Sequence, residues 1–350
     1  MTEIQVQTNQ RSYSVFAERG LLSHLPVTAA PGEKALIVTD SNVAPLYCDT
    51  VEQSLKKAGF SVHRFVFKSG EQAKNLTVFG EILEVLAMLR FSRTDKIFAL
   101  GGGVVGDLAG FAASAFMRGI EFYQIPTTLL AMVDSSVGGK TGVNLAHGKN
   151  LTGAFWQPTA VFLDADTLTT LPELQIKNGT AEMLKTGVIR DAELFARLAD
   201  SDTPELADIL RCIEIKAEIV SQDERESGVR KLLNFGHTVG HAVEKLSDYA
   251  VPHGFAVAAG MAVAVASAQK RGLASGCLDP LLAALRRHGL PRGTEYGAAE
   301  LAQAVLSDKK LAGGKIDLIL PTRIGSAEVV PLDVGEIEGF IADGLEVLRR

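Results

Sequence analysis

Residues 96–115, KIFALGGGVVGDLAGFAASA, decide the fold. An apolar strand, Lys96–Leu100, runs into a GxGxxG turn at Gly101–Gly106 and then into an apolar helix, Leu108–Ala115. Glycines let the backbone approach a pyrophosphate closely, and the amides at a helix N-terminus accept its charge. The strand and helix on either side argue against a plain tight turn. The stretch therefore predicts a dinucleotide-binding turn in an α/β domain.

The same alternation of predicted strands and helices extends toward the N-terminus. Short apolar runs at Ala35–Val38 and Val62–Phe67 predict strands, and amphipathic stretches at Val51–Ala58 and Val78–Leu89 predict helices. This alternation is typical of βαβ units and a parallel sheet. Before it, residues 2–16 alternate apolar and polar side chains, which predicts a β-hairpin.

The second half of the chain is predicted to be mainly helical. Strand signals fade from about Pro172. Helical periodicity follows in six segments: 179–190, 205–221, 232–246, 254–270, 279–288 and 298–306. A short strand at 316–320 and a helix at 334–349 close the chain. A length of 350 residues also favours two domains, so we expect an α/β domain over 1–170 and a mainly helical one over 171–350.

Composition and charge point to a soluble metabolic enzyme. The net charge of −6, with 22% charged and 47% hydrophobic residues, gives no footprint for nucleic acid or an anionic membrane. The longest apolar run, 255–268, is too short for a membrane span, and the N-terminus lacks a signal-peptide pattern. Three widely spaced cysteines suggest neither disulfides nor a thiolate metal site, so we expect a cytoplasmic protein.

A second stretch, Asp134–Asn144 followed by His147–Asn150, concentrates glycines, hydroxyl groups and lysines. Such a stretch can wrap an anion. Gly138–Thr141 resembles the end of a P-loop, but the first glycine of that motif would fall on Asp134, so we reject the P-loop. The alternative is a flexible solvated loop. Apolar residues such as Val143 argue against it and indicate a packed loop.

Histidines gather further along the chain. His237 and His241 are four residues apart in a helical segment, so they share one face, and His253 follows before the next helix. Imidazoles at this spacing invite a zinc site completed by a carboxylate, for which Glu182 is the candidate. Two alternatives stay open at this point. The histidines can be satisfied within the core, and Glu182 with Lys185 can form an ordinary surface ion pair.

Together these segments resemble the 3-dehydroquinate synthase family over nearly the whole chain. The resemblance rests on runs in the same order at residues 40–43, 69–74, 101–107, 117–119, 125–130, 134–144, 148–158, 171–172, 181–185, 230–241 and 308–310. It implies a Rossmann-like parallel-sheet N-terminal domain that binds NAD, followed by a mainly α-helical domain that binds metal and substrate. It also implies a shikimate-pathway lyase acting on 3-deoxy-D-arabino-heptulosonate 7-phosphate.

The implied reaction has five steps. The C5 hydroxyl is oxidised by NAD, phosphate leaves by β-elimination, C5 is reduced again, the ring opens, and an intramolecular aldol reaction closes the carbocycle. The residues that the resemblance implies for NAD are Asp40, Asn42, Glu71, Lys74, Gly102, Gly103, Val104, Asp107, Thr127, Thr128, Leu130, Asp134, Ser135, Lys149, Thr167, Thr170 and Leu171. An acid that usually follows the glycine turn by about twenty residues is missing here, and the resemblance supplies Glu71 instead.

The resemblance also implies a divalent metal, Zn²⁺ or Co²⁺, held by Glu182, His237 and His253, which makes His241 a substrate contact. The implied contacts to the substrate phosphate are Lys140, Asn150, His241, one of Lys309 and Lys310, and Arg118 from the neighbouring subunit of a homodimer. Those to the substrate carboxylate are Lys216, Arg230 and Asn234, with Lys185 near the C4 and C5 hydroxyls. A substrate with two anionic groups needs such a concentration of cations in an acidic protein.

One position departs from the family pattern, which usually reads His-Gly-Glu where this chain has His253-Gly254-Phe255. If that glutamate orients a ligand, its loss changes the metal affinity. Three other functions are weighed against the synthase. Another sugar phosphate cyclase shares the framework. An NAD- and metal-dependent polyol dehydrogenase has no use for so many anion-binding lysines. A catalytically silent relative has only Phe255 in its favour.

Overall fold

The computed structural model describes all residues except 10, 308–313 and 350. The chain divides into two compact units: unit 1 is Met1–Pro172 with Lys216–Glu224, and unit 2 is Glu173–Ile215 with Arg225–Arg350. The division expected from the sequence, after residue 170, did not include the return of Lys216–Glu224 to unit 1. That segment begins in the second half of one continuous helix, α6 (Leu206–Gln222). Periodicity shows that a helix is amphipathic but not which unit each turn packs against.

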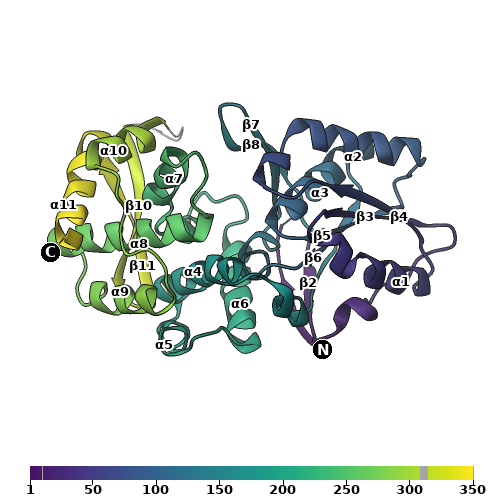
Figure 1. Ribbon diagram of the computed structural model, residues 1–350, viewed down its shortest axis with the longest axis horizontal. Coiled ribbons are helices and arrows are strands. Elements are labelled where there is room, and N and C mark those ends of the chain that lie inside the picture. Colours follow the sequence, from purple (N-terminus) through teal and green to yellow (C-terminus); the bar gives the residue numbers. More distant parts are fainter. Residues whose placement is uncertain (10, 308–313, 350) are drawn as a thin grey trace. The chain divides into compact units, whose positions relative to one another are not determined.

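Unit 1 is built on a mostly parallel sheet (Figure 1). Its strands run in the order β1-β2-β9-β6-β5-β3-β4, and each neighbouring pair is parallel except β1 with β2. The strand bounds are β1 Thr2–Val6, β2 Tyr13–Ala17, β3 Lys34–Asp40, β4 Ser61–Phe67, β5 Lys96–Gly101, β6 Glu121–Pro126 and β9 Ala160–Leu163. The predicted N-terminal hairpin and parallel sheet are confirmed.

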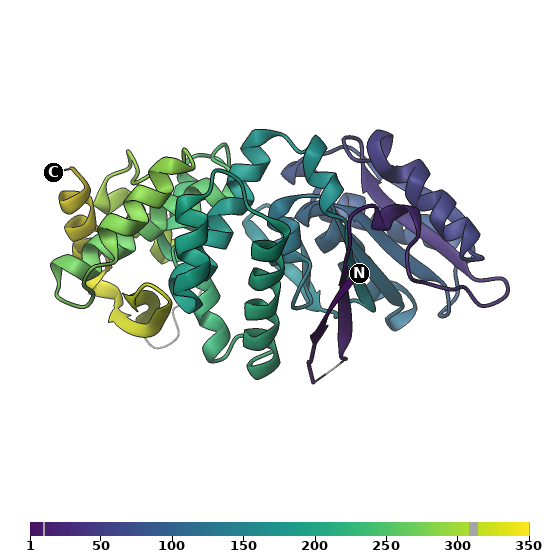
Figure 2. The ribbon, with the colours of Figure 1, turned by 90° about the horizontal axis from the view of Figure 1, so that it is seen from below.

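Helices cover both faces of this sheet (Figures 1 and 2). Successive side chains of a strand point to opposite faces. In β3, Leu36 and Val38 pack with α2 (Leu76–Met88) and α3 (Gly103–Ala115), whereas Ala35 and Ile37 pack with α1 (Asp49–Lys57). A strand that is buried on both faces has a continuous run of apolar residues, so the sequence predicted β3 clearly.

The stretch predicted as a packed loop forms a β-hairpin instead, β7 (Lys140–Leu145) with β8 (Gly148–Phe155). Its glycines allow the two strands to cross closely. A Cβ at Gly153 would lie 2.0 Å from the carbonyl oxygen of Thr141, and one at Gly142 would lie 2.7 Å from that of Thr152. Glycine weakens the strand signal in a sequence, which explains why the hairpin was read as a loop.

Unit 2 is mainly helical, with one antiparallel hairpin. Its helix α8 (His253–Lys270) is buried from Ala256 to Ala268 and packs against α4, α7 and α11. The other elements are α4 Glu173–Arg190, α5 Ala192–Asp200, the first part of α6, α7 His237–Leu246, α9 Leu278–Arg287, α10 Ala298–Ser307, α11 Ile337–Arg349, β10 Lys315–Arg323 and β11 Ser326–Asp333.

Five of the six predicted helical segments, the strand at 316–320 and the closing helix at 334–349 (α11) are confirmed. In the remaining segment, 232–246, the helix α7 begins only at His237, after the left-handed Gly236. Two elements were missed. The helix α5 has only nine residues, and β11 is half-exposed without a regular apolar alternation. Within the described ranges, no helix combines the length and apolar character needed to cross a membrane.

Candidate functional site

The residues predicted to bind NAD gather at one edge of the unit 1 sheet. Asp40 ends β3, Gly102 follows β5 and Thr127 follows β6, while Thr167 lies in η6 (Ala165–Thr170) after β9. The carboxyl ends of parallel strands meet at the same edge. The order β4-β3-β5 reverses the direction of strand addition between β3 and β5. Ligands of open α/β sheets bind at such a reversal, which Asp40 and Gly102 flank here.

The glycine turn lies against a second predicted segment. A Cβ added at Gly102 would be 3.0 Å from Cγ2 of Thr128, and one at Gly103 would be 3.0 Å from Oγ of Ser135. The helix α3 begins at Gly103, so its unpaired amides open onto this turn. A glycine turn at a helix N-terminus, where an added Cβ would crowd Thr128 and Ser135, suits the close approach of a pyrophosphate.

Other predicted NAD residues lie on neighbouring segments. Oδ1 of Asp40 accepts hydrogen bonds from the amides of Asn42 (2.8 Å) and Val43 (3.1 Å), which shapes the turn after β3. The remaining members lie in three places. Val104 and Asp107 belong to α3, Leu130 and Asp134 to the segment around η5 (Ala131–Ser135), and Thr170 and Leu171 to the end of η6.

A polar network joins the predicted NAD residues to Asn150, which was predicted to contact phosphate. The ammonium of Lys74 bonds to the Asp107 carboxylate and lies 2.6 Å from Oδ1 of Asn150. Nδ2 of Asn144 donates to Oε1 of Glu71 (2.8 Å), and Oδ1 of Asn144 accepts from the Asn150 amide (2.9 Å). The sequence assigned no role to Asn144, although it ends the quoted stretch 134–144. Asn150 is therefore joined to the predicted NAD residues Glu71, Lys74 and Asp107 by hydrogen bonds within unit 1.

Cations predicted to bind the substrate occupy two kinds of position in unit 1. Nζ of Lys216 donates to the carboxylate of Asp134 at 2.5 Å and to its carbonyl oxygen, and only 7% of Lys216 is exposed. Lys140, at the start of β7, and Arg118, in η4 (Phe116–Arg118), are exposed. Arg118 lies in the left-handed region, with φ of 66°. The exposed pair is accessible to ligands from solution or from another subunit.

The predicted metal ligands come together in unit 2. Glu182 lies in the middle of α4, His237 begins α7 and His253 begins α8. Oε1 of Glu182 is 3.4 Å from Nε2 of His253 and 3.9 Å from Nε2 of His237. One donor atom from each of the three residues lies within 4.8 Å of the others. One carboxylate and two imidazoles at this separation match the donor set of a zinc site.

The carboxylate of Glu182 has room for a further partner. It is 1% exposed, and neither oxygen accepts a regular hydrogen bond from the part of the chain that the structure describes. Nζ of Lys185, itself 2% exposed, lies 2.5 Å from Oε2. This contact is an ion pair between two buried groups. A buried anion with open acceptor positions fits a divalent cation.

The titration properties of Glu182 and His237 also suit metal binding. Burial favours the protonated form of Glu182, but the Lys185 ammonium together with His253 and His237 outweighs it and holds the pKa of Glu182 well below its ordinary value. Burial, together with Lys185, lowers the pKa of His237 to about 3. Burial works in the same direction on His253, but its contacts with the carboxylates of Glu182 and Glu244 raise its pKa to about 10. Glu182 is therefore anionic and His237 neutral near neutral pH.

The turn before His237 depends on glycine. Gly236 has φ of 79°, and a Cβ there would lie 2.6 Å from Cγ of Met261 and 2.7 Å from the carbonyl oxygen of Val257. The absence of a side chain lets the start of α7 approach α8. His237 is thereby brought to His253, and their ring centroids are 5.2 Å apart.

His241 lies one turn further along α7 and is exposed. Its ring centroid is 5.2 Å from that of His237. His241 also belongs to a second group of close donor atoms, with Glu244 and His253. The sequence reading missed Glu244, although its spacing of seven from His237 places it on the same face of the helix.

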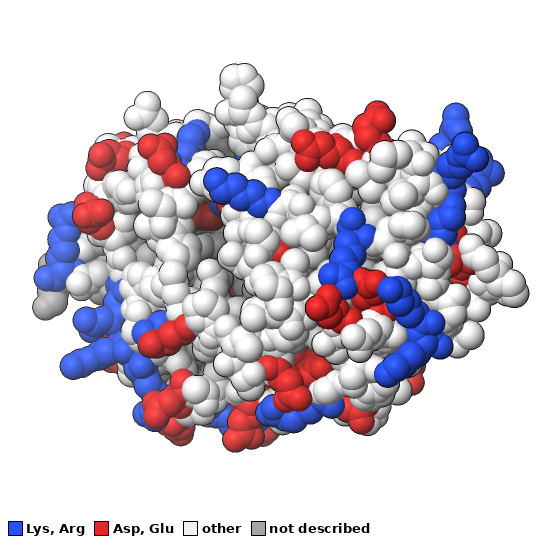
Figure 3. Space-filling view, turned by 45° about the vertical axis from the view of Figure 1, so that its right-hand side comes forward, with Lys and Arg blue, Asp and Glu red and all other residues white. Residues whose placement is uncertain are grey.

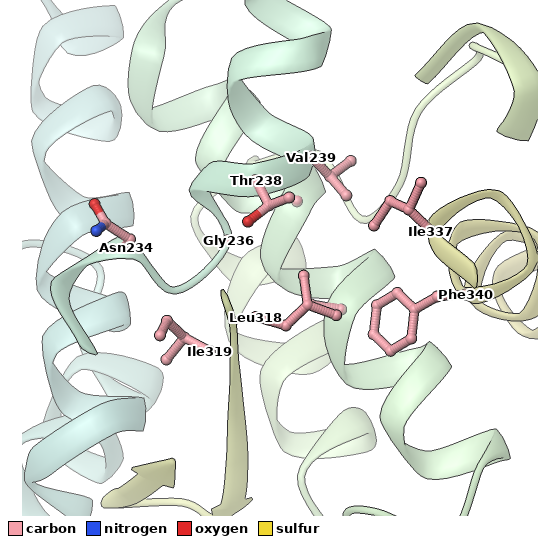
Figure 4. Close-up of a pocket in the computed structure, with 10 residues that line it drawn as sticks. Asn234, Gly236, Thr238, Val239, Leu318, Ile319, Ile337 and Phe340 are labelled. Carbon is pink, nitrogen blue, oxygen red and sulfur yellow. The ribbon is translucent and has the colours of Figure 1, made fainter. Parts of the chain in front are cut away.

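The short helix η7 (Val229–Asn234) carries two residues predicted to bind the substrate carboxylate. Arg230 is 2% exposed, and Nδ2 of Asn234 donates to Oε1 of Glu226. A small hollow beside this segment is shown in Figure 4. It is lined mainly by apolar side chains, which include Leu318, Ile319 and Phe340. It shares Asn234 with the predicted site but none of the predicted metal ligands.

Several of the predicted cations are buried. Figure 3 shows basic and acidic side chains interspersed on the face in view. In contrast, Lys74, Lys185, Lys216 and Arg230 are each at most 7% exposed. Buried cations are rare unless anions compensate them, so they mark places where a protein has a use for positive charge. Lys309 and Lys310 lie outside the described residues.

Solved structures with this fold define the class of protein. A 2-deoxy-scyllo-inosose synthase structure with carbaglucose-6-phosphate, NAD⁺ and Co²⁺ is 26% identical, with a TM-score of 0.86 over 98% of this chain and 100% of that one. ValA, the 2-epi-5-epi-valiolone synthase from Streptomyces hygroscopicus subsp. jinggangensis 5008 with NAD⁺ and Zn²⁺, is 29% identical, with a TM-score of 0.88 over 97% and 98%. The chain has the α/β fold of these synthases.

Sequence comparisons identify one family within this class of synthases. Residues 64–178 match the family 3-dehydroquinate synthase N-terminal, and residues 179–311 match 3-dehydroquinate synthase C-terminal. A 3-dehydroquinate synthase from Alkaliphilus metalliredigens (strain QYMF) is 42% identical over 352 residues, which cover 97% of this chain and 98% of the relative. The chain belongs to the 3-dehydroquinate synthase family.

Proposed function

We propose that this chain is the lyase that converts 3-deoxy-D-arabino-heptulosonate 7-phosphate to 3-dehydroquinate and phosphate, with NAD and a divalent metal as cofactors. The observation that carries the proposal is the group Glu182, His237 and His253, with the carboxylate buried and its oxygens open, in a chain of this family. Zn²⁺ or Co²⁺ is the metal that such a donor set favours.

Each cofactor supplies one kind of chemistry. When bound, NAD⁺ would accept a hydride from C5 and NADH would return it, and the metal would supply Lewis-acid polarisation of the substrate oxygens. The protein residues hold the two anionic ends of the substrate. Lys140, Asn150 and His241 are proposed for the phosphate, and Lys216 and Arg230 for the carboxylate. Charge-assisted hydrogen bonds of this kind keep a substrate in place through several steps.

The elimination step needs no dedicated protein base in this scheme. Once C5 is a ketone, the proton on C6 is acidic, and the substrate phosphate can remove it as the C–O bond breaks. Lys140 and Asn150 orient that phosphate. After the phosphate has left, the carboxylate contacts proposed for Lys216 and Arg230 retain the intermediate until C5 is reduced again. A polyol dehydrogenase, by contrast, releases its ketone product and has no use for these cations.

The remaining parts of the proposal concern assembly and location. We propose a homodimer in the cytoplasm, in which Arg118 reaches the phosphate bound to the neighbouring subunit. Its exposed side chain and left-handed backbone support this role. Mixing Arg118→Ala chains with Lys140→Ala chains tests it. Activity that reappears on mixing supports a shared site, whereas two inactive variants that stay inactive argue against it.

The decisive experiment for the reaction uses far less NAD than substrate. Phosphate is followed by a coupled assay and NADH by its absorbance in the same sample. Complete phosphate release without net NADH supports the synthase, and NADH formed one for one with substrate loss supports the dehydrogenase. A hexose phosphate and a heptulose phosphate without the carboxylate serve as controls. Turnover of either in place of the heptulosonate would instead support another sugar phosphate cyclase.

A further inference from the structure

Glu244 is a buried carboxylate that the proposed reaction does not use. It lies on α7 and is 3% exposed. Its Oε2 is 3.2 Å from Nδ1 of His253. A buried carboxylate is costly unless its charge serves a partner. The partner here is the imidazole proposed to bind the metal.

The contact determines which nitrogen of His253 is left for a ligand. An ionised carboxylate can only accept, so Nδ1 carries the proton and donates it to Glu244. In the neutral ring, the lone pair then lies on Nε2, which faces Oε1 of Glu182 at 3.4 Å. His237 shows the same arrangement. Its Nδ1 is 3.1 Å from the carbonyl oxygen of Phe235, and its Nε2 faces Glu182.

The backbone of His253 is held separately from its ring. The amide of Gly254 donates to Oδ1 of Asn178 at 2.6 Å, and a Cβ at Gly254 would lie 2.0 Å from the Asn178 carbonyl oxygen. Asn178 belongs to α4, the helix that carries Glu182. The start of α8 is thus anchored to α4, while rotation of the imidazole is restrained by Glu244 from α7.

We infer that Glu244 is a positioning residue for the metal site, holding His253 in the tautomer and ring orientation that present Nε2 to the metal. The inference rests on the metal site of the proposed function. It also bears on Phe255, which replaces the usual family glutamate. His253 retains a carboxylate partner because Glu244 supplies one. Carboxylates that hold a ligating histidine in this way are typically worth 10- to 100-fold in metal affinity.

One other use of these atoms competes with this inference. Glu244, His241 and His253 themselves form a group of close donor atoms. If Nδ1 of His253 bound a second cation there, Glu244 would be a ligand rather than a hydrogen-bond acceptor. The two roles differ in the number of metal ions bound and in the protonation of Nδ1.

The test measures zinc affinity of the metal-free protein by competition with a chelator, for the unaltered chain, Glu244→Gln and Glu244→Ala. We expect one zinc per chain, weakened about 10- to 100-fold in Glu244→Ala and less in Glu244→Gln, whose amide oxygen can still accept. Glu224→Gln is the matched control. Glu224 is also a buried glutamate, but it accepts from Asn9 and Gln157 in unit 1. It is expected to leave zinc affinity unchanged.

Nitrogen NMR of labelled histidines in the unaltered, zinc-loaded protein supplies a readout that needs no variant. A protonated Nδ1 and a metal-bound Nε2 on His253 support the inference. Unchanged zinc affinity in both Glu244 variants overturns it while the metal site stands. Loss of one of two bound zinc ions in Glu244→Ala overturns it in favour of the second metal group. If the unaltered chain and His237→Ala are alike in binding no zinc, the proposed metal site itself fails.

Discussion

Nζ of Lys185 lies 2.5 Å from Oε2 of Glu182, one helical turn earlier on α4, and both side chains are at most 2% exposed. Removing one partner of a buried ion pair leaves an uncompensated charge. We therefore predict that Lys185→Met destabilises the metal-free protein by about 3–5 kcal/mol. Zinc should restore part of this loss, because it supplies positive charge to the same carboxylate.

Denaturant unfolding with a chelator or with zinc measures both effects. Lys177→Met is a control on the same helix, because Lys177 pairs with Glu173 at a more exposed position. That pair should contribute less than about 1 kcal/mol, with no dependence on zinc. Equal destabilisation of the two variants would show that the Lys185 pair is not special.

A second prediction separates the three histidines. Glu182→Gln and His237→Ala should lose most of their bound zinc, because each removes a donor atom from a site that needs all three. His241→Ala should keep its zinc and lose activity, because we assign its exposed imidazole to the substrate phosphate. Metal content after gel filtration measures the difference. Anomalous scattering at the zinc edge that placed His241 among the ligands would reverse the assignment.

A third prediction concerns protons released on metal binding. The pKa of His253 in the metal-free protein is raised to about 10, so below that pH the ring holds a proton that zinc at Nε2 must displace. Lower pH therefore weakens binding, by about tenfold for each unit between roughly pH 6 and 8. Glu182 and His237, with pKa values below that range, add nothing. Calorimetry in buffers of different ionisation enthalpy should show about one proton released per zinc ion. Release of none would contradict the charged state of His253.

The sequence predicted the fold where local pattern and tertiary packing agree. The run Ala35–Val38 is apolar because β3 is buried on both faces, so it was recognised as a strand. The hairpin β7–β8 was not, because Gly142 and Gly153 permit close strand contact but have no strand propensity. The sequence also did not show that Lys216–Glu224 belongs to unit 1, because most of this segment continues the helix α6, which begins in unit 2.

Parts of the candidate site depended on long-range contacts. Spacing suggested His237 with His241, and only the resemblance pointed to His253, sixteen residues away. The structure brings Glu182, His237 and His253 together because α8 packs against α4 at Gly254 and against the start of α7 at Gly236. Pairings such as Lys74 with Asp107 could not be read from the sequence, because they join separate segments.

The last prediction distinguishes substrate contacts from NAD contacts within one hairpin. Lys140 and Lys149 lie on paired strands, β7 and β8, but we assign Lys140 to the substrate phosphate and Lys149 to NAD. Lys140→Ala should keep its NAD affinity and lose about 1.5–3 kcal/mol of substrate binding or transition-state stabilisation, which is about 10- to 150-fold in kcat/KM. Arg230→Ala should behave in the same way through the substrate carboxylate.

Lys149→Ala should instead weaken the binding of NAD. Gly102→Val, which fills the space beside Thr128, is a positive control for lost NAD binding. Isothermal titration with NAD and steady-state kinetics on all four variants provide the measurements. If Lys140→Ala lost as much NAD affinity as Lys149→Ala, both lysines would belong to the cofactor, and the substrate phosphate would have to be held elsewhere.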